Sequence, residues 1–281
     1  MKKWFIVLFV FFYMQTTAQN AELRKYPLTT VSDVAGFSVL NILDSYLSPL
    51  TYSGMAIFYE RTGQKLFSPE NTSVSMQGRF RTLAGLTVNP QSTASITYLG
   101  AGYSWGAYYH FQITNELRLQ AGSLIDAGFA VKQNARNVNN PYNFDLATNL
   151  NLSANANYDI ATKRRTIRVS FGFETPLMGC MFVPESGMSY YELFGLKNYT
   201  NAVHFSSLHN KQGLSVHTSI EIPFKYSTWK FGIGSNELKY KANDMVFKHN
   251  EYMLLIGLKY NLYRFIGTKN SAPENFISTY K

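Results

Sequence analysis

The sequence predicts an all-β protein, a closed antiparallel up-and-down transmembrane β-barrel, from three observations. The first is a strand-like alternation from Tyr252 to Tyr263, in which every even position is apolar or aromatic. The second is an aromatic content of 20 Tyr, 21 Phe and 3 Trp without a mature segment long enough for a membrane helix. The third is an export signal on a chain whose one cysteine, Cys180, excludes an intramolecular disulfide framework.

The first residues have the organisation of a secretory signal peptide. Lys2 and Lys3 precede an apolar run at 4–14, and the small residues at 16–18 offer a cleavage site. We therefore expect four regions along the chain: a signal peptide at 1–18, a periplasmic segment at 19–33, the outer-membrane barrel at 34–266 and a periplasmic tail at 267–281.

The charge balance indicates a lipid rather than a nucleic-acid environment. Removing Lys2 and Lys3 from the 26 basic residues leaves 24 against 17 acidic ones, a net charge of +7. These charges are scattered and form no basic stripe, so nucleic acid is not expected as a partner. A positive balance suits outer-membrane lipid and lipopolysaccharide as surroundings.

Period-two alternation predicts a series of strands along the chain. In 99–113, for example, apolar and aromatic side chains from Leu99 to Phe111 alternate with glycines and polar residues. A soluble β-sandwich alternates too, but segments of ten or more residues with aromatic ends favour the membrane barrel. The other predicted strands are 51–61 (less regular), 72–82, 117–131, 146–158, 166–175, 214–224, 228–237 and 252–263.

Connection lengths predict the orientation and the strand number. Three connections are tight (114–116, 160–165 and 225–227), and longer ones lie between them (85–92, 133–145, 176–212 and 238–250). Because outer-membrane barrels combine short periplasmic turns with long external loops, the tight set is assigned to the periplasm. The N-terminus then requires one more strand, at 34–44, which makes about ten. Twelve follows if 176–212 holds a hairpin around 190–196 and 202–208, and eight is the smaller alternative.

Short motifs resemble a known family. The run Leu43 to Leu50, followed by Tyr52 and Gly54, and the segment Asn137 to Pro141 are similar to an uncharacterised family of small exported outer-membrane β-barrel proteins from Gram-negative gut-type bacteria. The resemblance implies a location and a fold. It implies no residue roles, because the family has no established activity.

The predicted register brings charges together inside the barrel. Closing the loop near 176 and 213 sets Arg168 opposite Glu221, and closing the turn near 224 and 228 sets Glu221 beside Lys230. A carboxylate between two cations is a stable way to confine charge, so we expect a lumenal cluster of these three residues. The remaining polar residues expected in the lumen are Arg79, Arg81, Arg118, Asp126, Glu174 and His217. We interpret them as a salt-bridge plug, with a selectivity-setting constriction as the alternative.

The function predicted from these features is a structural, narrow-channel or surface-interaction role, with a protein or glycan partner at the long external loops. One alternative is a lipid A or phospholipid modifying enzyme using His204 and Ser206, which share a strand face, with Glu192 or Glu221 orienting the histidine. A barrel component of a secretion or assembly machine is a further alternative. No cofactor is expected, and the histidines lack the spacing of a metal site.

Overall fold

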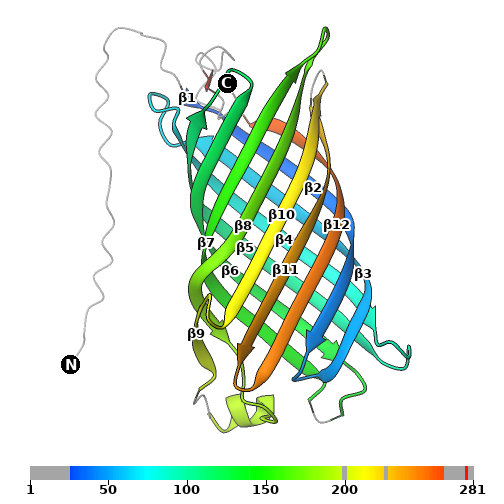
Figure 1. The fold of residues 1–281 in the computed structure, drawn as a ribbon. Helices are drawn as coiled ribbons and strands as arrows, with labels where there is room; N and C mark the ends of the chain where they lie inside the picture. Colours follow the sequence, from blue (N-terminus) through cyan, green and yellow to red (C-terminus); the bar gives the residue numbers. More distant parts are fainter. Residues whose placement is uncertain (1–25, 139, 198–200, 225–226, 263–275, 278–281) are drawn as a thin grey trace, which may run out of the picture.

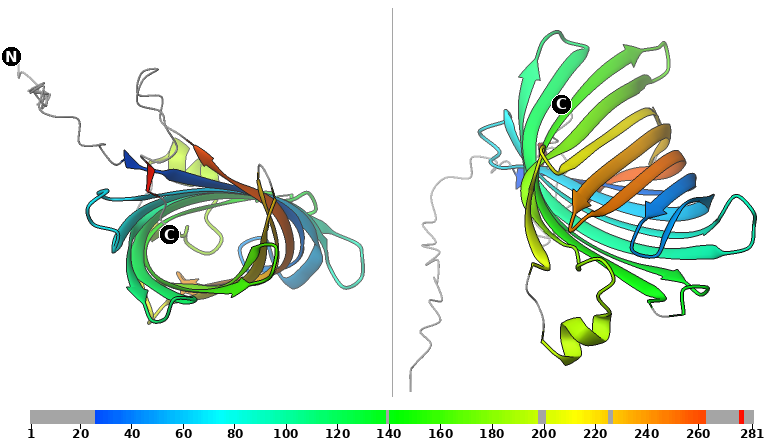
Figure 2. Two further views of the ribbon diagram at one scale, coloured as in Figure 1. Left: turned by 90° about the horizontal axis from the view of Figure 1, so that it is seen from above. Right: turned by 60° about the horizontal axis from the view of Figure 1, so that its bottom comes forward.

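The chain forms an antiparallel β-barrel in the computed structural model, which describes residues 26–138, 140–197, 201–224, 227–262 and 276–277 (Figure 1). Ten strands form the closed ring seen along the axis in Figure 2. They are β2 (Thr29–Asp44), β3 (Ser48–Leu66), β4 (Val74–Val88), β5 (Ser95–Gln112), β6 (Leu117–Asn134), β7 (Tyr142–Ala161), β8 (Thr166–Phe182), β10 (Lys211–Pro223), β11 (Thr228–Ala242) and β12 (Met245–Leu262). The predicted count of about ten is confirmed.

The barrel closes where its last strand pairs with its first. β12 pairs antiparallel with β2 from Thr29 opposite Leu262 to Asp44 opposite Phe247. The Thr30 hydroxyl also donates a hydrogen bond to Asn261 Oδ1 at 3.0 Å across this seam. The predicted final strand therefore closes against the weakly patterned strand around 34–44, which begins earlier than expected, at Thr29.

Three short strands and one helical turn lie outside the ring. Strands β1 (Tyr26–Pro27) and β13 (Phe276–Ile277) pair in parallel, and β9 (Val203–Ser207) adds to the edge of β8. A single π-helical turn, η1, spans Tyr191–Gly195. Among the described residues, no helix combines the length and apolar character that crossing a bilayer would require. The predicted signal peptide and most of the predicted tail lie outside the described residues.

The two ends of the barrel differ in their connections. At the upper end in Figure 1, which we name the turn end, lie the connections 67–73, 113–116, 162–165 and 224–227, together with β1. The opposite, cap end carries 45–47, 89–94, 135–141, 243–244 and the long segment 183–202. Only this last connection is long, so the expected long loops at 85–92, 133–145 and 238–250 are wrong: the connections there are 89–94, 135–141 and 243–244.

The clearest correction concerns 238–250, which we expected to be a loop. β11 and β12 instead continue through it and meet in a two-residue turn at Asn243 and Asp244, with φ of 49° and 57°. Two consecutive positive φ values match the twist of a β-hairpin, and Asn and Asp tolerate them. The expectation failed because the outward residues change from apolar to charged along these strands, which hides the alternation.

The hairpin that would have made twelve strands is also absent from the described residues. Its predicted first strand, 190–196, is largely the π-helical turn η1, and its second, 202–208, is the single strand β9. Because β9 pairs with β8 and is followed by β10, it lengthens the wall at the cap end without adding a crossing.

The outer face of the seam strands is apolar over a limited height. Phe37, Met55 and Leu254 are about two-thirds exposed on this face. A polar cluster bounds it toward the turn end, where Asp33 accepts hydrogen bonds from Tyr59 and Tyr260. Such a belt with tyrosines at its edge is typical of a strand surface that contacts lipid.

The polarity pattern reverses toward the cap end. Many inward side chains there belong to two buried apolar clusters, the first of which extends as far as Val34, while the outward side chains on β11 and β12 include three lysines. The first cluster is Val34, Leu40, Ile42, Ala56, Phe58, Leu83 and Phe247; the second is Tyr46, Leu47, Tyr52, Ile96, Met181, Val183 and Met245. Apolar-in and polar-out is the arrangement of a strand that faces water, so the barrel extends beyond the lipid at this end.

Candidate functional site

The centre of the lumen is crossed by an ion pair between opposite sides of the barrel. Arg79 and Arg81 alternate inward on β4, and Nη2 of Arg79 lies 2.8 Å from Oε1 and from Oε2 of Glu174 on β8. Asn151 donates a second hydrogen bond to Glu174 at 2.6 Å, and Nε of Arg79 donates to Ser104 at 3.2 Å. These contacts satisfy both charges within the barrel.

A second ion pair joins β4 to β12. Nη2 of Arg81 lies 2.8 Å from both oxygens of Glu251, whose side chain is fully buried. Glu60 lies 3.9 Å from Nε of the same guanidinium, and Phe58 lies beneath it at 5.1 Å. Arg81 thus links two carboxylates and an aromatic ring on one side of the lumen.

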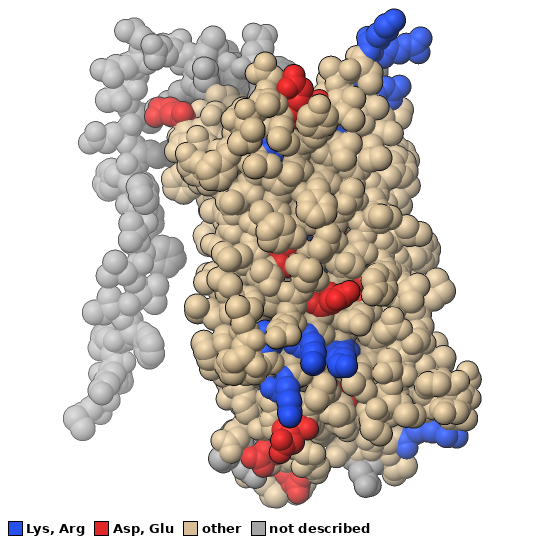
Figure 3. Space-filling model, viewed as in Figure 1, with Lys and Arg blue, Asp and Glu red and all other residues tan. Residues whose placement is uncertain are grey.

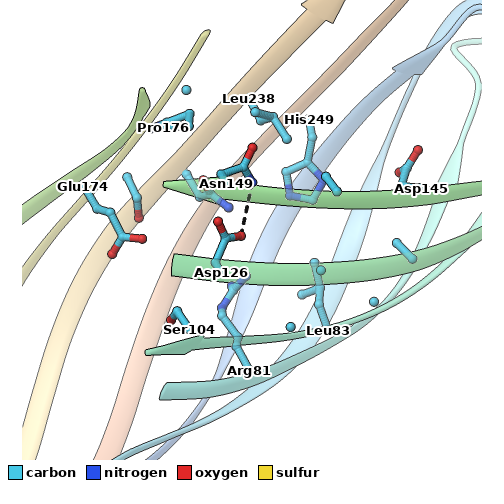
Figure 4. Close-up of a pocket in the computed structure, with 18 of the residues that line it drawn as sticks. Arg81, Leu83, Ser104, Asp126, Asp145, Asn149, Glu174, Pro176, Leu238 and His249 are labelled. Carbon is cyan, nitrogen blue, oxygen red and sulfur yellow. Dashed lines mark hydrogen bonds between the residues drawn. The ribbon is translucent and has the colours of Figure 1, made fainter. Parts of the chain in front are cut away.

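A cavity of about 360 Å³ lies between these pairs (Figure 4). Its polar wall carries Asp126, Asn149 and Glu174, with Asn149 donating to Asp126 Oδ2 at 3.2 Å, and apolar side chains such as Leu83 and Leu238 line another part. Asp126 Oδ1 is buried without a hydrogen-bond partner among the described residues. A polar cavity of this size holds several water molecules, which would satisfy such an atom.

Glycines create this space. Gly102 on β5 lies opposite Gly128 on β6, and both face inward at the cavity. A Cβ atom on Gly128 would have no heavy atom within 4 Å, and one on Gly102 would have none closer than 3.5 Å. The wall is therefore thin here because side chains are missing, and the cavity exists for the same reason.

The lumen is closed toward the cap end by a buried lysine and its partners. Nζ of Lys132 lies 2.5 Å from Asp44 and 2.8 Å from Asp145, and 3.9 Å from the centre of the Phe247 ring. Tyr240 donates to Asp145 at 3.0 Å. Since these residues come from strands on different sides of the ring, their contacts cross the lumen.

A second layer fills the lumen toward the turn end. Nζ of Lys259 lies 2.8 Å from Glu221 Oε2, and both side chains are about nine-tenths buried. Gln64 donates to the Ser75 hydroxyl at 2.9 Å, and His110 Nε2 lies 2.7 Å from the same hydroxyl. The cavity thus lies between two layers of hydrogen-bonded side chains.

The residues of the predicted lumenal cluster occupy neighbouring strands but have other ion-pair partners. The register sets Arg168 opposite Glu221 and Glu221 opposite Lys230. The ion pairs, however, join Arg168 to Asp159 at 2.6 Å and Glu221 to Lys259. Arg168 and Glu221 therefore each have an ion-pair partner outside the predicted cluster of three.

The other predicted lumenal residues divide between the cavity and the rim. Arg79, Arg81, Asp126, Glu174 and His217 line the cavity, whereas Arg118 donates to Gln112 at the turn-end rim. Sequence reasoning missed several charged lumenal residues: Asp44, Glu60, Lys132, Asp145 and Glu251. Strand parity could have revealed Lys132, because Asp126, Gly128, Ala130 and Lys132 follow one another on the inner face of β6.

The enzymatic candidates are not assembled into a triad. His204 and Ser206 lie on β9, and His204 Nε2 and Ser206 Oγ are buried without hydrogen-bond partners among the described residues. Glu192 accepts hydrogen bonds from Ser189 instead, which lower the pKa of its carboxyl. The serine–histidine contact nearest to them is between Ser207 Oγ, at the end of β9, and His209 Nδ1 in the following exposed turn, at 2.6 Å.

Two tyrosines hold the long segment 183–202 over the cap end. Tyr46 donates to the Met188 carbonyl at 2.7 Å, and Tyr190 donates to Asn143 at 2.6 Å while accepting from the Phe144 amide. Burial, followed by the charges of Asp44 and Glu192, raises the pKa of Tyr46 to about 12. Both phenols are therefore neutral donors at physiological pH.

No ligand set for a metal is found in the described part of the chain, where His, Cys, Asp and Glu side chains do not gather in groups of three or more around one point. Many charged side chains of the lumen are acids and bases that are hydrogen-bonded to one another. This arrangement closes a lumen and does not supply an open coordination site.

Comparison with known proteins gives similar solved structures and a family. Solved structures with a similar fold include the outer-membrane protease OmpT from Escherichia coli, with 7% sequence identity, a TM-score of 0.45, and coverage of 84% of this chain and 96% of that chain. The transport unit of the autotransporter AIDA-I, also from Escherichia coli, has 10% identity and a TM-score of 0.42, covering 89% and 94%. Neisserial surface protein A has 11% identity and a TM-score of 0.34, covering 83% and 97%.

A comparison with curated protein sequences gave no significant match. A family model matches residues 4–269, almost the whole chain. Its description is "Protein of unknown function (DUF3316)", in agreement with the resemblance to an uncharacterised family seen in the sequence. The chain is an outer-membrane-type β-barrel and belongs to the DUF3316 family.

Proposed function

We propose that this protein is a non-conducting outer-membrane barrel that acts through its cap end as an interaction scaffold. The observation that carries the proposal is the filled lumen: ion pairs and apolar clusters cross it on both sides of the cavity. Solute passage requires a continuous water path, and buried contacts such as Lys132–Asp44 and Glu221–Lys259 oppose one.

We further infer that the chain is exported by its N-terminal signal peptide to the outer membrane of a Gram-negative bacterium, with the cap end outside. The long segment 183–202 at the cap end, and β1 at the turn end, support a periplasmic location for the turn end. The reversed polarity of β11 and β12 supports a cap end that projects from the lipid. A long segment anchored by Tyr46 and Tyr190 then forms the outermost surface, where Tyr191 and Leu196 are strongly exposed.

The orientation can be tested with the single cysteine of the chain. In a Cys180→Ser background, new cysteines are placed at the cap end by Val138→Cys and at the turn end by Lys163→Cys. A membrane-impermeant maleimide added to intact cells is expected to label the first variant and not the second. Both variants should be labelled after the cells are broken. Labelling of Lys163→Cys alone in intact cells would reverse the assignment.

Conductance tests the closed lumen directly. Purified native protein in a planar bilayer is expected to give no stepwise current. A matched control removes large groups from both layers, combining Tyr240→Ala and Phe247→Ala with Glu221→Ser and Lys259→Ser, and is expected to admit small ions. Stepwise current through the native protein would overturn the proposal.

The Ser207–His209 contact is the one observation that favours the enzymatic alternative. Its geometry suits proton transfer, but neither side chain bonds to a carboxylate among the described residues, and the pair lies at the exposed end of β9. Lipid A and phospholipid profiles from cells carrying Ser207→Ala, His209→Ala or His204→Ala should match the native profile. A change confined to one or more of these variants would favour the enzyme.

A further inference from the structure

Three lysines gather on the outer face of the barrel near its cap end. Lys239 and Lys241 on β11 and Lys248 on β12 are all exposed, and basic side chains are visible over these strands in Figure 3. We name them the lysine patch. Lys239 lies directly opposite Lys248 in the strand register, with Gln212 on its other side on β10.

The strand register sets the depth of the lysine patch. The outward-facing register partners on β11, β12, β2 and β3 form rows across the wall. The last mainly apolar row toward the cap end is Ser235, Tyr252, Val39 and Met55. The next row toward the cap end is Glu237, Asn250, Asn41 and Ser53. Lys239 and Lys248 form the row beyond that, four residues or about 13 Å along the strand from Tyr252. With the tilt of barrel strands this is roughly 10 Å along the membrane normal, which is the headgroup depth.

The opposite limit of the apolar belt agrees with this assignment. Asp33 on β2 bounds the belt at the turn end and Asn41 bounds it at the cap end, eight residues apart. Eight residues span about 26 Å along a strand. After tilt this leaves an apolar height of roughly 20 Å, close to the apolar band of outer-membrane barrels. The lysine patch therefore lies immediately outside the hydrocarbon.

The positive charges of the lysine patch are not neutralised by acidic side chains among the described residues. None of its members forms an ion pair within 4.0 Å among the described residues, and the nearest outward acid by register, Glu237, is bonded to Tyr252. Like charges directly opposite each other on neighbouring strands are destabilising. An anion placed between Lys239 and Lys248 would convert this repulsion into attraction.

We infer that the lysine patch binds the phosphate of an anionic glycolipid of the lipid A class in the outer leaflet. The inference rests on the proposed orientation, which puts the cap end outside. Lipid-borne phosphate fits both the charge and the depth of the patch, while its acyl chains would lie on the apolar rows at Tyr252 and Val39. Gln212 adds an uncharged donor beside Lys239.

Native mass spectrometry of the full chain in detergent tests the inference, with bound lipid counted directly. The probes are diphosphorylated lipid A, lipid A from which both phosphates have been removed, and inorganic phosphate. Diphosphorylated lipid A is expected to remain bound to the native protein. In the variant Lys239→Gln/Lys241→Gln/Lys248→Gln its apparent affinity should fall at least tenfold.

A matched control removes the same charge from the other end of the barrel. Lys65, Lys163 and Arg164 are exposed at the turn end, and their replacement by Gln should leave lipid A binding within twofold of native. Far-UV circular dichroism confirms that both triple variants are folded. The native protein should bind phosphate-free lipid A at least tenfold more weakly, and millimolar inorganic phosphate should not displace the intact lipid.

Equal binding by the two triple variants, or equal binding of the phosphate-free lipid, would overturn the inference. Displacement by inorganic phosphate at low concentration would instead assign the patch to the free ion and would also overturn it. None of these results bears on conductance, so the non-conducting barrel stands or falls separately.

Discussion

Arg79 of β4 and Glu174 of β8 meet across the barrel, with Nη2 of the guanidinium 2.8 Å from each carboxylate oxygen. Strands β5, β6 and β7 separate their strands around the ring. The pair therefore connects two distant parts of the wall and fills the space between them. Breaking such a buried pair costs more than the intact pair contributes, because one charge is left without a partner.

Removal of Arg79 tests this cost. Arg79→Met leaves Glu174 with Asn151 as its one hydrogen-bond partner among the described residues and is expected to lower the free energy of unfolding by about 3 to 5 kcal/mol. The double variant Arg79→Met/Glu174→Gln should lose less than the sum of the two single variants. Urea unfolding in phospholipid vesicles, followed by tryptophan fluorescence, measures all three. Additive losses would show that the two residues are not coupled.

Replacing a glycine of the barrel wall by alanine is expected to raise stability at one position and lower it at another. Gly128→Ala places its new methyl group in the cavity and should change stability by less than about 1 kcal/mol, in the stabilising direction. Gly106→Ala would bring the same group against the Ser123 carbonyl oxygen of the neighbouring strand. We expect it to cost more than about 2 kcal/mol in the same unfolding experiment. Similar losses at both glycines would contradict the described cavity.

Asn243 ties the β11–β12 turn to the long segment. Its side-chain nitrogen donates to the carbonyls of Val183 and Asn201, each at 2.9 Å. Asn243→Gly keeps the positive φ but removes both bonds, so the barrel should remain folded while the segment loosens. Hydrogen exchange at Val183 and along β9 should accelerate at least tenfold, with β2–β7 unchanged. Unchanged exchange at β9 would mean that other contacts hold the segment.

Tyr46 predicts a pH dependence at the cap end. Its pKa is about 12 in the folded chain, against 10.0 for a free tyrosine. Because the pKa of Tyr46 is higher in the folded chain, its ionisation does not change the free energy of unfolding below pH 10. Between pH 10 and 12 the tyrosine ionises mainly in the unfolded chain, so the folded chain loses stability. Tyr46→Phe should cost about 1 kcal/mol at pH 8 by losing the bond to Met188. Its disadvantage should shrink and then reverse by pH 12. A constant difference across this range would show that Tyr46 ionises normally.

The strands could be predicted from the sequence where their outer face contacts lipid along its whole length. Where lipid covers the outer face, alternation alone identifies strands such as 99–113 and 252–263, and the inner face tolerates almost any small or polar residue. The lumenal register also follows from hairpin geometry, which is why Arg168, Glu221 and Lys230 occupy neighbouring positions. Side-chain partners do not follow from register alone. Lys259 reaches Glu221 from β12, two strands away in the ring, past Lys230, which is the register neighbour of Glu221 on β11.

The cap end could not be predicted because the outer face of a single strand passes from lipid into water there. From Glu237 onward the outer face meets water and the inner face becomes an apolar core. The two-residue alternation continues, but the outward positions are now polar and the inward ones apolar. The stretch containing Lys239, Lys241 and Lys248 therefore looks like a loop in the sequence. Lys132 was missed for the same reason, since it lies inward in a stretch that was assigned to the loop 133–145 and its boundary.

The seam between β2 and β12 has a consequence for how the protein is made. Thr30 and Asn261 are 231 residues apart, yet they are bonded to each other, and β1 pairs with β13 just beyond them. The first strand delivered across the membrane thus has no second neighbour until the last one arrives. During assembly its open edge must be protected, and a chain that stops short of β12 cannot seal itself, however well its other strands are formed.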